Sequence, residues 1–399
     1  MKDVFIYDAI RSARTRAKAD GGLHELTPPE LLAQLYRHLE TRCSLDPALV
    51  SELILGCVTQ AGEQAANIAK TSALHAGWPD SVAGLTVNRF CSSSIDAIAI
   101  AGLKIAAGQA SAVVAGGIEM MSRVPMLSDG ARVFSDPAYA VRNQVLLMGS
   151  GADLIATRLK ASREDCDAVG LQSQQRAAQA QAEGRFSSIV PIETSAGAIN
   201  TDECVRGGIT MEKLSALPPA FAELGAAGAD AVQLKRYPEL ECIEHVHTAG
   251  NSPAMCDAAA VVLLGDAQLG KALGIAPRAR LMASTTACGE PLEVLSGCIS
   301  ATRKLIDENA LKTDDIDLFE IHEAFAATMI KAERELALGQ DRLNVNGGVI
   351  ALGHPMGATG AIMTGTLLDE LERQALTTGV VAASGAAGSG SALLITRET

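Results

Sequence analysis

Short apolar runs alternate with amphipathic stretches in the first third of the chain. The pattern predicts buried strands at residues 4–9, 53–58 and 111–116 and helices at 31–40, 67–76 and 92–107. In the last of these helices, Ile95, Ile98, Gly102 and Ile105 recur at helical spacing and share one face. Alternation of this kind is typical of a mostly parallel sheet with helices on its faces.

The C-terminal part of the chain repeats the alternation. The predicted elements are strands at 279–286, 316–321, 379–384 and 391–396 and helices at 293–309, 323–337 and 358–374. A helix leads into Ala112-Val113-Val114-Ala115-Gly116 in the first half and into Gly379-Val380-Val381-Ala382-Ala383 in the second. This echo suggests that the same α/β unit occurs twice.

The segment from about 123 to 250 has a different character. Arg, Gln, Ser, Asp and Pro become more frequent there, although one helix is predicted at 163–183 and apolar anchors persist. Long insertions in compact enzymes usually serve a site. We therefore expect an inserted lid or loop domain between the two halves.

Charge and cysteine content narrow the range of partners. The 399 residues carry a formal net charge of −13, which weighs against nucleic acid or an anionic membrane as general partner. No apolar run approaches about 18 residues, and the segment that begins with Met1-Lys2-Asp3 lacks the plan of a signal peptide. The nine cysteines include no CxxC pair. We expect a cytoplasmic protein with reduced thiols, no metal and no tightly bound cofactor.

Cys91 is the first candidate for chemistry. It lies in Val87-Asn88-Arg89-Phe90-Cys91-Ser92-Ser93-Ser94-Ile95-Asp96, at a predicted corner between a strand and a helix. The N–H groups and dipole of a helix start favour a thiolate, so we expect the pKa of this thiol to lie below its ordinary value of about 8.5. A thiolate forms and breaks thioesters readily. Most of the other eight cysteines are expected to be buried and inert.

Two histidines lie at similar corners. His354 is surrounded by glycines between Asn346 and Gly360, and glycine lets the backbone approach a ligand closely. His322 follows the strand predicted at 316–321, where active-site groups gather in open α/β sheets. Glu323 either orients a neighbouring group or supplies charge to the first turn of a helix. Each histidine has the alternative of a purely structural role.

Four motifs in order resemble those of the thiolase family, and the resemblance covers the whole chain. They are Asn88-Arg89-Phe90-Cys91-Ser92-Ser93, then Ala115-Gly116-Gly117-Ile118-Glu119-Met120-Met121-Ser122-Arg123-Val124-Pro125, then His322-Glu323-Ala324-Phe325, and finally Gly353-His354-Pro355-Met356-Gly357-Ala358-Thr359-Gly360. The similarity is greatest to 3-ketoacyl-CoA thiolases that partner a multifunctional subunit of fatty-acid β-oxidation.

The resemblance implies a thiolase-like α/β fold with duplicated five-layered αβαβα halves and an inserted loop domain. The N-terminal half would comprise residues 1–122 and about 250–270, the loop domain 123–249 and the C-terminal half 271–399. It also implies a homodimer or tetramer, with a multifunctional hydratase/dehydrogenase subunit as a possible further partner.

The resemblance also implies an acetyl-CoA acyltransferase that cleaves 3-ketoacyl-CoA with coenzyme A as second substrate. Cys91 would be the nucleophile and His354 its base. Two oxyanion holes are needed: His354 and His322 with a water would form one, and the N–H of Cys91 with one from the loop Gly385–Gly388 the other. Met148 is expected to line the acyl pocket, and Ser252 and Gly385 to contact substrate.

The chain departs from the family pattern at three positions. Ser384 stands where family members carry an acid/base cysteine, and a hydroxyl is a poor acid or base at neutral pH. Pro253 replaces a serine that contacts CoA, although Ser252 is adjacent, and Ser94 replaces a glycine.

These departures leave three functional hypotheses. The first is a 3-ketoacyl-CoA thiolase with a rearranged acid/base. The second is an acyltransferase with a Cys-His-His set like that of decarboxylating ketosynthases, in which Cys91 is loaded but no α-proton is abstracted. The third is an inactive thiolase-like scaffold subunit, against which the presence of both Cys91 and His354 argues.

Overall fold

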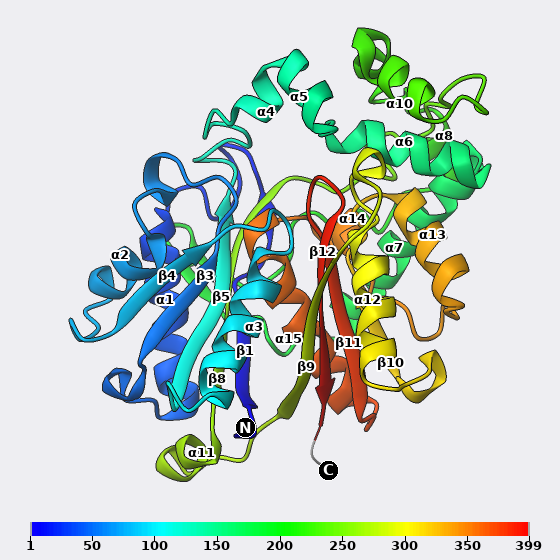
Figure 1. Ribbon diagram of the computed structural model, residues 1–399. Coiled ribbons are helices and arrows are strands. Elements are labelled where there is room, and N and C mark those ends of the chain that lie inside the picture. Colours follow the sequence, from blue (N-terminus) through cyan, green and yellow to red (C-terminus); the bar gives the residue numbers. More distant parts are fainter. Residues whose placement is uncertain (1, 398–399) are drawn as a thin grey trace.

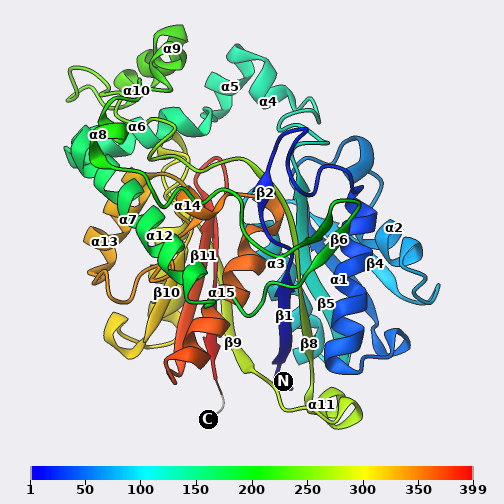
Figure 2. The same cartoon turned by 180° about the vertical axis from the view of Figure 1, so that it is seen from behind.

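The computed structural model describes residues 2–397, which form five alternating layers of helices and sheet (Figures 1 and 2). Two half-sheets alternate with three helical layers, and α3 (Ser93–Ala106) and α15 (Thr359–Arg373) form the middle one. Each half of the chain thus gives one half-sheet, one outer helical layer and one helix of the shared middle layer. The family fold expected from the sequence is confirmed in this form.

The strands of the described chain belong to one large sheet and one small hairpin. The large sheet has the order β10-β11-β12-β9-β1-β8-β5-β3-β4, with β2 paired to β8. Its strands are β1 (Phe5–Arg11), β2 (Thr15–Arg16), β3 (Glu52–Gly56), β4 (Ala83–Val87), β5 (Ala112–Met120), β8 (Cys256–Gly265), β9 (Ala279–Cys288), β10 (Leu318–Ile321), β11 (Thr378–Ser384) and β12 (Ser389–Thr396). The hairpin consists of β6 (Ile192–Thr194) and β7 (Gly197–Ile199).

The two half-sheets share one topology. In the N-terminal half, β3 runs parallel to β5, and β5, β8 and β1 are successively antiparallel. In the C-terminal half, β10 runs parallel to β11, and β11, β12 and β9 are successively antiparallel. The strands β5 and β11 therefore hold equivalent places, which confirms the predicted echo between the halves. The expectation of a mostly parallel sheet is wrong, because β8 and β12 return antiparallel beside them.

The helices cover both faces of each half-sheet. The outer layers contain α1 (Pro28–Cys43) and α2 (Ile68–His75) on one side and α12 (Gly297–Glu308) and α13 (Ala326–Leu336) on the other. The remaining helices are α4 (Arg132–Ser135), α5 (Pro137–Asn143), α6 (Met148–Leu159), α7 (Arg163–Ala182), α8 (Met211–Ser215), α9 (Ala222–Leu224), α10 (Asp230–Arg236), α11 (Ala267–Leu273) and α14 (Val349–Leu352).

Local sequence explains where two of these helices begin. Thr27 and Glu30 form a reciprocal capping box at the start of α1, with Pro28 at the first helical position. Ser162 and Asp165 form the same device at the start of α7, the long helix predicted at 163–183. Both caps satisfy backbone N–H groups that an α-helix leaves without internal partners.

The middle layer is buried on every side. Ile95 and Ile98 of α3 and Ile362 and Leu367 of α15 are at most 1% exposed and belong to one core with residues of both half-sheets. Gly360 allows the two helices to meet, because a Cβ there would lie 2.4 Å from Cγ1 of Ile95. Cys91 and His354 come just before the first turns of α3 and α15 in the chain. The segment that contains α4 to α10 lies above the layers in Figure 1.

Candidate active site

Cys91 lies in a tight turn between β4 and α3. Phe90 adopts φ +51°, a left-handed conformation that is unfavourable for a side chain of its size. The Asn88 side chain accepts a hydrogen bond from the Phe90 N–H at 2.8 Å, which helps to hold this turn. Cys91 is 8% exposed and lines an internal cavity.

The serines after Cys91 fix the turn to the rest of the molecule. The hydroxyl of Ser92 donates to the carbonyl of Ala383 in β11 at 2.7 Å, and that of Ser94 accepts from the N–H of Ala361 in α15 at 3.0 Å. Ser94, a departure from the family pattern, thus connects the two middle helices. The position of the Cys91 thiol is therefore set jointly by both halves of the chain.

His354 is the hydrogen-bond partner of the Cys91 thiol. Its Nε2 lies 3.1 Å from Sγ of Cys91, and its Nδ1 lies 2.8 Å from the hydroxyl of Thr359 at the start of α15. The backbone N–H of His354 donates to the carbonyl of Ala254 at 2.8 Å, which ties the preceding Gly353 turn, at φ +98°, to the segment before β8. Both ring nitrogens are occupied, so the orientation of the imidazole is defined.

The Cys91–His354 pair is uncharged at rest. Burial, followed by the nearby Glu119 carboxylate, raises the pKa of Cys91 to about 12, and its own backbone N–H offsets this only slightly. Burial, followed by His322 and Arg14, lowers the pKa of His354 well below its usual value. The expectation of a thiolate favoured by the helix start is wrong, because loss of water outweighs the helix terminus.

His322 lies directly beside His354. The ring centroids are 4.4 Å apart at an interplanar angle of 41°. Burial lowers the pKa of His322 to about 4, and the backbone of Ser384, which favours the charged ring, offsets this only in part. Within residues 2–397, neither ring nitrogen makes a hydrogen bond of normal geometry. A neutral imidazole with unsatisfied polar atoms at a cavity wall is suited to bind a water or a substrate oxygen.

These three side chains share one cavity of about 500 Å³. Its walls also include Met148 at the start of α6 and Ser252, whose buried hydroxyl has no partner in the described part of the chain. The other lining residues are apolar apart from backbone groups: Met121, Met126, Leu127, Leu147, Gly149, Phe221, Leu224, Pro253, Ala254, Met255, Leu295, Ala324, Phe325 and Met356. The structure thus brings Cys91, His322, His354, Met148 and Ser252 together.

Ser384 and Gly385 are not among the lining residues of this cavity. The hydroxyl of Ser384 is fully buried, donates to the carbonyl of Leu295 at 2.9 Å and accepts from the N–H of Cys298 at 2.9 Å. The N–H of Gly385 donates to the carbonyl of Ser389 at 2.7 Å, and that of Gly388 to Val294 at 2.8 Å. Backbone partners therefore occupy the polar groups that the resemblance assigned to these residues.

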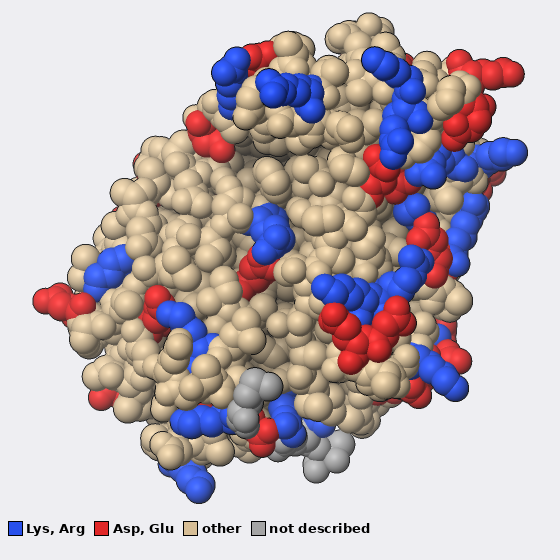
Figure 3. Space-filling model, viewed as in Figure 1, with Lys and Arg blue, Asp and Glu red and all other residues tan. Residues whose placement is uncertain are grey.

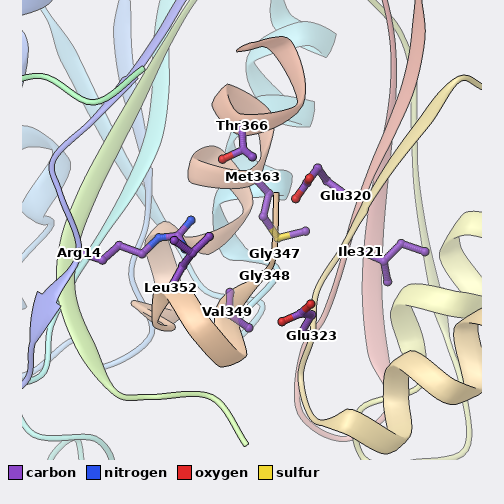
Figure 4. Close-up of a pocket in the computed structure, with 10 residues that line it drawn as sticks. All are labelled: Arg14, Glu320, Ile321, Glu323, Gly347, Gly348, Val349, Leu352, Met363 and Thr366. Carbon is purple, nitrogen blue, oxygen red and sulfur yellow. The ribbon is translucent and has the colours of Figure 1, made fainter. Parts of the chain in front are cut away.

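Charged side chains line a second, much smaller cavity (Figure 4). Arg14, Glu320 and Glu323 surround a cavity of about 10 Å³, the size of one water. Among the described residues, Nε and Nη1 of Arg14 have no hydrogen-bond partner. Burial raises the pKa of Glu320 well above its usual value. The positive charge of Arg14 is near enough to lower the pKa of His354.

Glu323 positions the segment that leads to His354. Its carboxylate accepts from the hydroxyl of Ser173 in α7 at 2.7 Å and from the N–H of Ile350 in α14 at 3.2 Å. The residue precedes α13, which begins at Ala326. The orienting role considered for Glu323 fits these contacts, and a place in the first turn of a helix does not.

Sequence reasoning assigned no role to Arg14, Glu119 or Thr359. Thr359 belongs to the glycine-rich motif, but nothing in the sequence shows that its hydroxyl forms a hydrogen bond with His354, five residues earlier. Arg14 and Glu119 come from distant segments. Within residues 2–397, no group of three or more His, Cys, Asp or Glu side chains is arranged to hold a metal ion, and no helix is long and apolar enough to span a membrane.

Comparison with known proteins identifies the family. The family model for the thiolase N-terminal domain matches residues 4–235, and that for the thiolase C-terminal domain matches residues 275–397. A 3-ketoacyl-CoA thiolase of Bacillus subtilis is 36% identical, over 98% of both chains. A steroid 3-ketoacyl-CoA thiolase of Mycobacterium tuberculosis is 36% identical, over 94% of this chain and 89% of the relative.

Two further comparisons extend the range of relatives. A 3-oxoadipyl-CoA/3-oxo-5,6-dehydrosuberyl-CoA thiolase of Escherichia coli is 36% identical, over 94% of both chains. The crystal structure of the Bacillus anthracis acetyl-CoA acetyltransferase matches with a TM-score of 0.86 and 34% identity, over 100% of this chain and 99% of that one. The chain therefore belongs to the thiolase family and is an acyltransferase.

Proposed function

We propose that the protein cleaves 3-ketoacyl-CoA with coenzyme A through an acyl-enzyme on Cys91, in fatty-acid-type β-oxidation. The observation that carries the proposal is the 3.1 Å contact between Sγ of Cys91 and Nε2 of His354 at the wall of a 500 Å³ cavity. A buried thiol that is hydrogen-bonded to a neutral imidazole becomes a strong nucleophile only when the imidazole removes its proton. This limits thiolate chemistry to the moment when substrate is bound.

The first half of the reaction acylates Cys91. His354 takes the thiol proton, the sulfur attacks the keto carbon, and the bond to the α-carbon breaks to release acetyl-CoA. The negative charge on the keto oxygen needs preorganised donors. We assign one oxyanion hole to His354 and His322 acting with a water, since the ring nitrogens of His322 are unsatisfied beside it.

The second oxyanion hole uses the backbone. The N–H of Cys91 makes no hydrogen bond in the described structure, and in the loop Gly385–Gly388 the same holds for Ala386 and Ala387. Gly385 and Gly388 are occupied, so we assign the donors to Cys91 and to Ala386 or Ala387. The expected contribution of such a donor is a factor of about 100 to 1,000 in rate.

Coenzyme A enters as the second substrate. The unpaired hydroxyl of Ser252 and the side chain of Met148 line the cavity and are assigned to its pantetheine arm or to the acyl chain. Lys and Arg side chains gather over α4, α5 and α10 at the upper rim of the molecule (Figure 3). Arg142 and Lys235 there are exposed and form no ion pair with another described residue. We assign the phosphates of CoA to this rim.

The second functional hypothesis, a decarboxylating or purely acyl-transferring enzyme, is not favoured. The two family domains match residues 4–235 and 275–397, and relatives named as thiolases cover almost the whole chain. An inactive scaffold is disfavoured by the intact contact between Cys91 and His354. A homodimer or tetramer and a multifunctional partner subunit remain part of the proposal.

The test is CoA-dependent cleavage of a 3-ketoacyl-CoA, followed as loss of enolate absorbance, with intact-protein mass on the same sample. We expect turnover in the wild type and a mass increase equal to the acyl group on Cys91. Cys91→Ala is expected to abolish both. Surviving label in Cys91→Ala would remove Cys91 as nucleophile, and acylation without cleavage of the carbon–carbon bond would favour the ketosynthase-like hypothesis.

A further inference from the structure

The active-site cavity contains few groups that can move a proton. Among its described lining residues these are Cys91, His322 and His354; no carboxylate, lysine or tyrosine is present. Thiolytic cleavage nevertheless needs a proton for the α-carbon of the departing acetyl group and a base for the thiol of CoA. A group that performs both must therefore be found within this set, or outside the cavity.

The side chain at position 384 is poorly placed for this work. The Ser384 hydroxyl donates to the carbonyl of Leu295 and accepts from the N–H of Cys298, and the Cys298 thiol also forms a hydrogen bond with it. The nearby thiol of Cys298 is fully buried in the core between α12 and the C-terminal strands, and burial raises its pKa to about 11. Neither residue lines the cavity.

We infer that His354 carries every proton of the reaction, from Cys91 to the α-carbon in the first half and from CoA to Cys91 in the second. The inference rests on the proposed thiolase function. It assigns to one histidine the work that the resemblance divides between a histidine and a second cysteine.

The geometry allows this because both proton transfers occur at the same place. After attack, the α-carbon of the substrate is two bonds from Sγ of Cys91. In the second half, the sulfur of CoA bonds to the acyl carbon and occupies that same position. The α-carbon and the CoA sulfur are each joined to Sγ of Cys91 through the same acyl carbon. Nε2 of His354 lies 3.1 Å from this Sγ. Thr359 holds the opposite nitrogen, so Nε2 stays directed at this centre.

The bonds and protons balance without another acid or base. In the first half, the S–H bond of Cys91 breaks, its proton goes to His354, and an S–C bond forms at the keto carbon. The bond between keto carbon and α-carbon then breaks, and the α-carbon keeps the electron pair and takes the proton from His354. In the second half, His354 takes the CoA proton, CoA displaces Cys91, and the released thiolate takes that proton back.

The electrostatics around His354 suit a group that gives its proton away quickly. Burial, His322 and Arg14 all lower its pKa, so its protonated form is a stronger acid towards a carbanion than an ordinary imidazolium. His322 is the alternative carrier. Its ring lies beside His354 but makes no hydrogen bond to Cys91 in the described chain, so it cannot take the proton of that thiol directly.

The test is exchange of the α-hydrogens of acetyl-CoA with D₂O, read by mass spectrometry in a Cys91→Ala background. This background removes nucleophile activation from the readout. We expect exchange to persist in Cys91→Ala and to change by less than about 3-fold on adding Ser384→Ala or Cys298→Ala. Adding His354→Asn is expected to reduce it by at least about 100-fold, the usual scale of general acid–base catalysis. Thermal unfolding checks that each variant is folded.

Three outcomes would overturn the inference. The first is exchange that survives His354→Asn, and the second is exchange that is lost with Ser384→Ala or Cys298→Ala in a folded protein. The third is exchange that is lost with His322→Asn but not with His354→Asn. A failure of the proposed thiolase function can be distinguished from a failure of this inference. A wild type that exchanges α-hydrogens through His354 but does not cleave 3-ketoacyl-CoA would refute thiolysis and leave the proton carrier in place.

Discussion

The neutral state of the Cys91 thiol has a direct chemical consequence. Burial and Glu119 raise the pKa of this thiol to about 12, so the thiolate fraction of the free enzyme increases with pH throughout the neutral and mildly alkaline range. We expect the rate of alkylation of Cys91 by iodoacetamide to rise steadily from pH 6 to pH 9, measured by peptide mass mapping. Exposed Cys288 provides an internal control for reagent quality. A plateau below pH 8 would show an activated thiolate and contradict the assignment.

The substitution Ser384→Cys tests whether a second thiol near the site increases the rate. If His354 carries every proton, Ser384→Cys should change the kcat of thiolysis by less than about 3-fold, because the group it supplies already has a substitute. The Ser384 side chain is also hydrogen-bonded to Leu295 and Cys298 and is not among the described lining residues of the cavity. A rise of 10-fold or more in kcat, with unchanged KM, would show that the missing thiol limits the enzyme.

At the scale of elements, Glu119 joins three segments around the nucleophile. Its buried carboxylate, near the end of β5, accepts from the N–H groups of Val58, Thr59 and Gly357 at 3.0–3.1 Å and from Gln64 Nε2 at 2.9 Å. Gly357 belongs to the loop that follows His354. The carboxylate therefore fixes the loop after β3 to the histidine loop.

Glu119→Ala should destabilise the fold strongly. It leaves the backbone N–H groups of Val58, Thr59 and Gly357 without an acceptor, whereas Gln64 keeps the carbonyl of Thr59. Each unsatisfied buried donor costs roughly 1–3 kcal/mol, so we expect a loss of more than about 3 kcal/mol in the free energy of unfolding, measured by urea denaturation. The control is Glu63→Ala, which removes an exposed ion pair with Arg123 and should cost less than about 1 kcal/mol. Equal losses in the free energy of unfolding for the two variants would refute the role of Glu119 in connecting the loop after β3 to the histidine loop.

The sequence predicts most of the elements but not all of their pairings. The strands at the places of β1, β3, β5 and β9 to β12 and the long helices were predicted within a few residues of their bounds. The central strand β8 was missed, because a continuous Ala- and Val-rich run fits a buried helix as well as a strand. Without β8, the antiparallel centre of the sheet could not be foreseen.

The candidate site shows the same division. Cys91, His322 and His354 follow from motif and position, since each lies at a strand end or helix start. The hydroxyl of Ser384 could not be placed from sequence, because its direction depends on Leu295 and Cys298, which are almost 90 residues away. Burial of the thiol likewise depends on tertiary packing, and this reverses the pKa shift expected from the helix start.

At the scale of the whole molecule, β4 ends the large sheet with an unpaired edge. Leu85 and Val87 on this strand are only partly buried, and Leu74 on the adjacent α2 is 48% exposed. Unprotected apolar edges of this kind are usually covered by another chain. We expect sedimentation at twice the chain mass of 41.3 kDa or more, and a shift towards monomer in Leu85→Lys. Sedimentation of the wild type as a monomer at micromolar concentration would contradict this expectation.

We expect the apolar cavity to limit which acyl groups the enzyme accepts. No Lys or Arg is among its described lining residues, so a carboxylate at the far end of the acyl chain would be buried without a counter-ion. Such burial costs several kcal/mol, and 1.4 kcal/mol is a factor of 10 in rate or affinity. The relatives include enzymes named for both kinds of acyl chain, apolar and carboxylate-bearing, so the family alone does not decide the matter.

A matched pair of substrates tests whether the enzyme prefers apolar or carboxylate-bearing acyl chains. 3-Oxohexanoyl-CoA and 3-oxoadipyl-CoA have the same number of acyl carbons and differ only in the terminal carboxylate. We expect kcat/KM to be at least about 100-fold higher for the uncharged substrate, since an unpaired buried charge costs several kcal/mol. Equal values would mean that the acyl chain reaches solvent or the basic rim over α5 and α10, and would move the acyl site out of the 500 Å³ cavity.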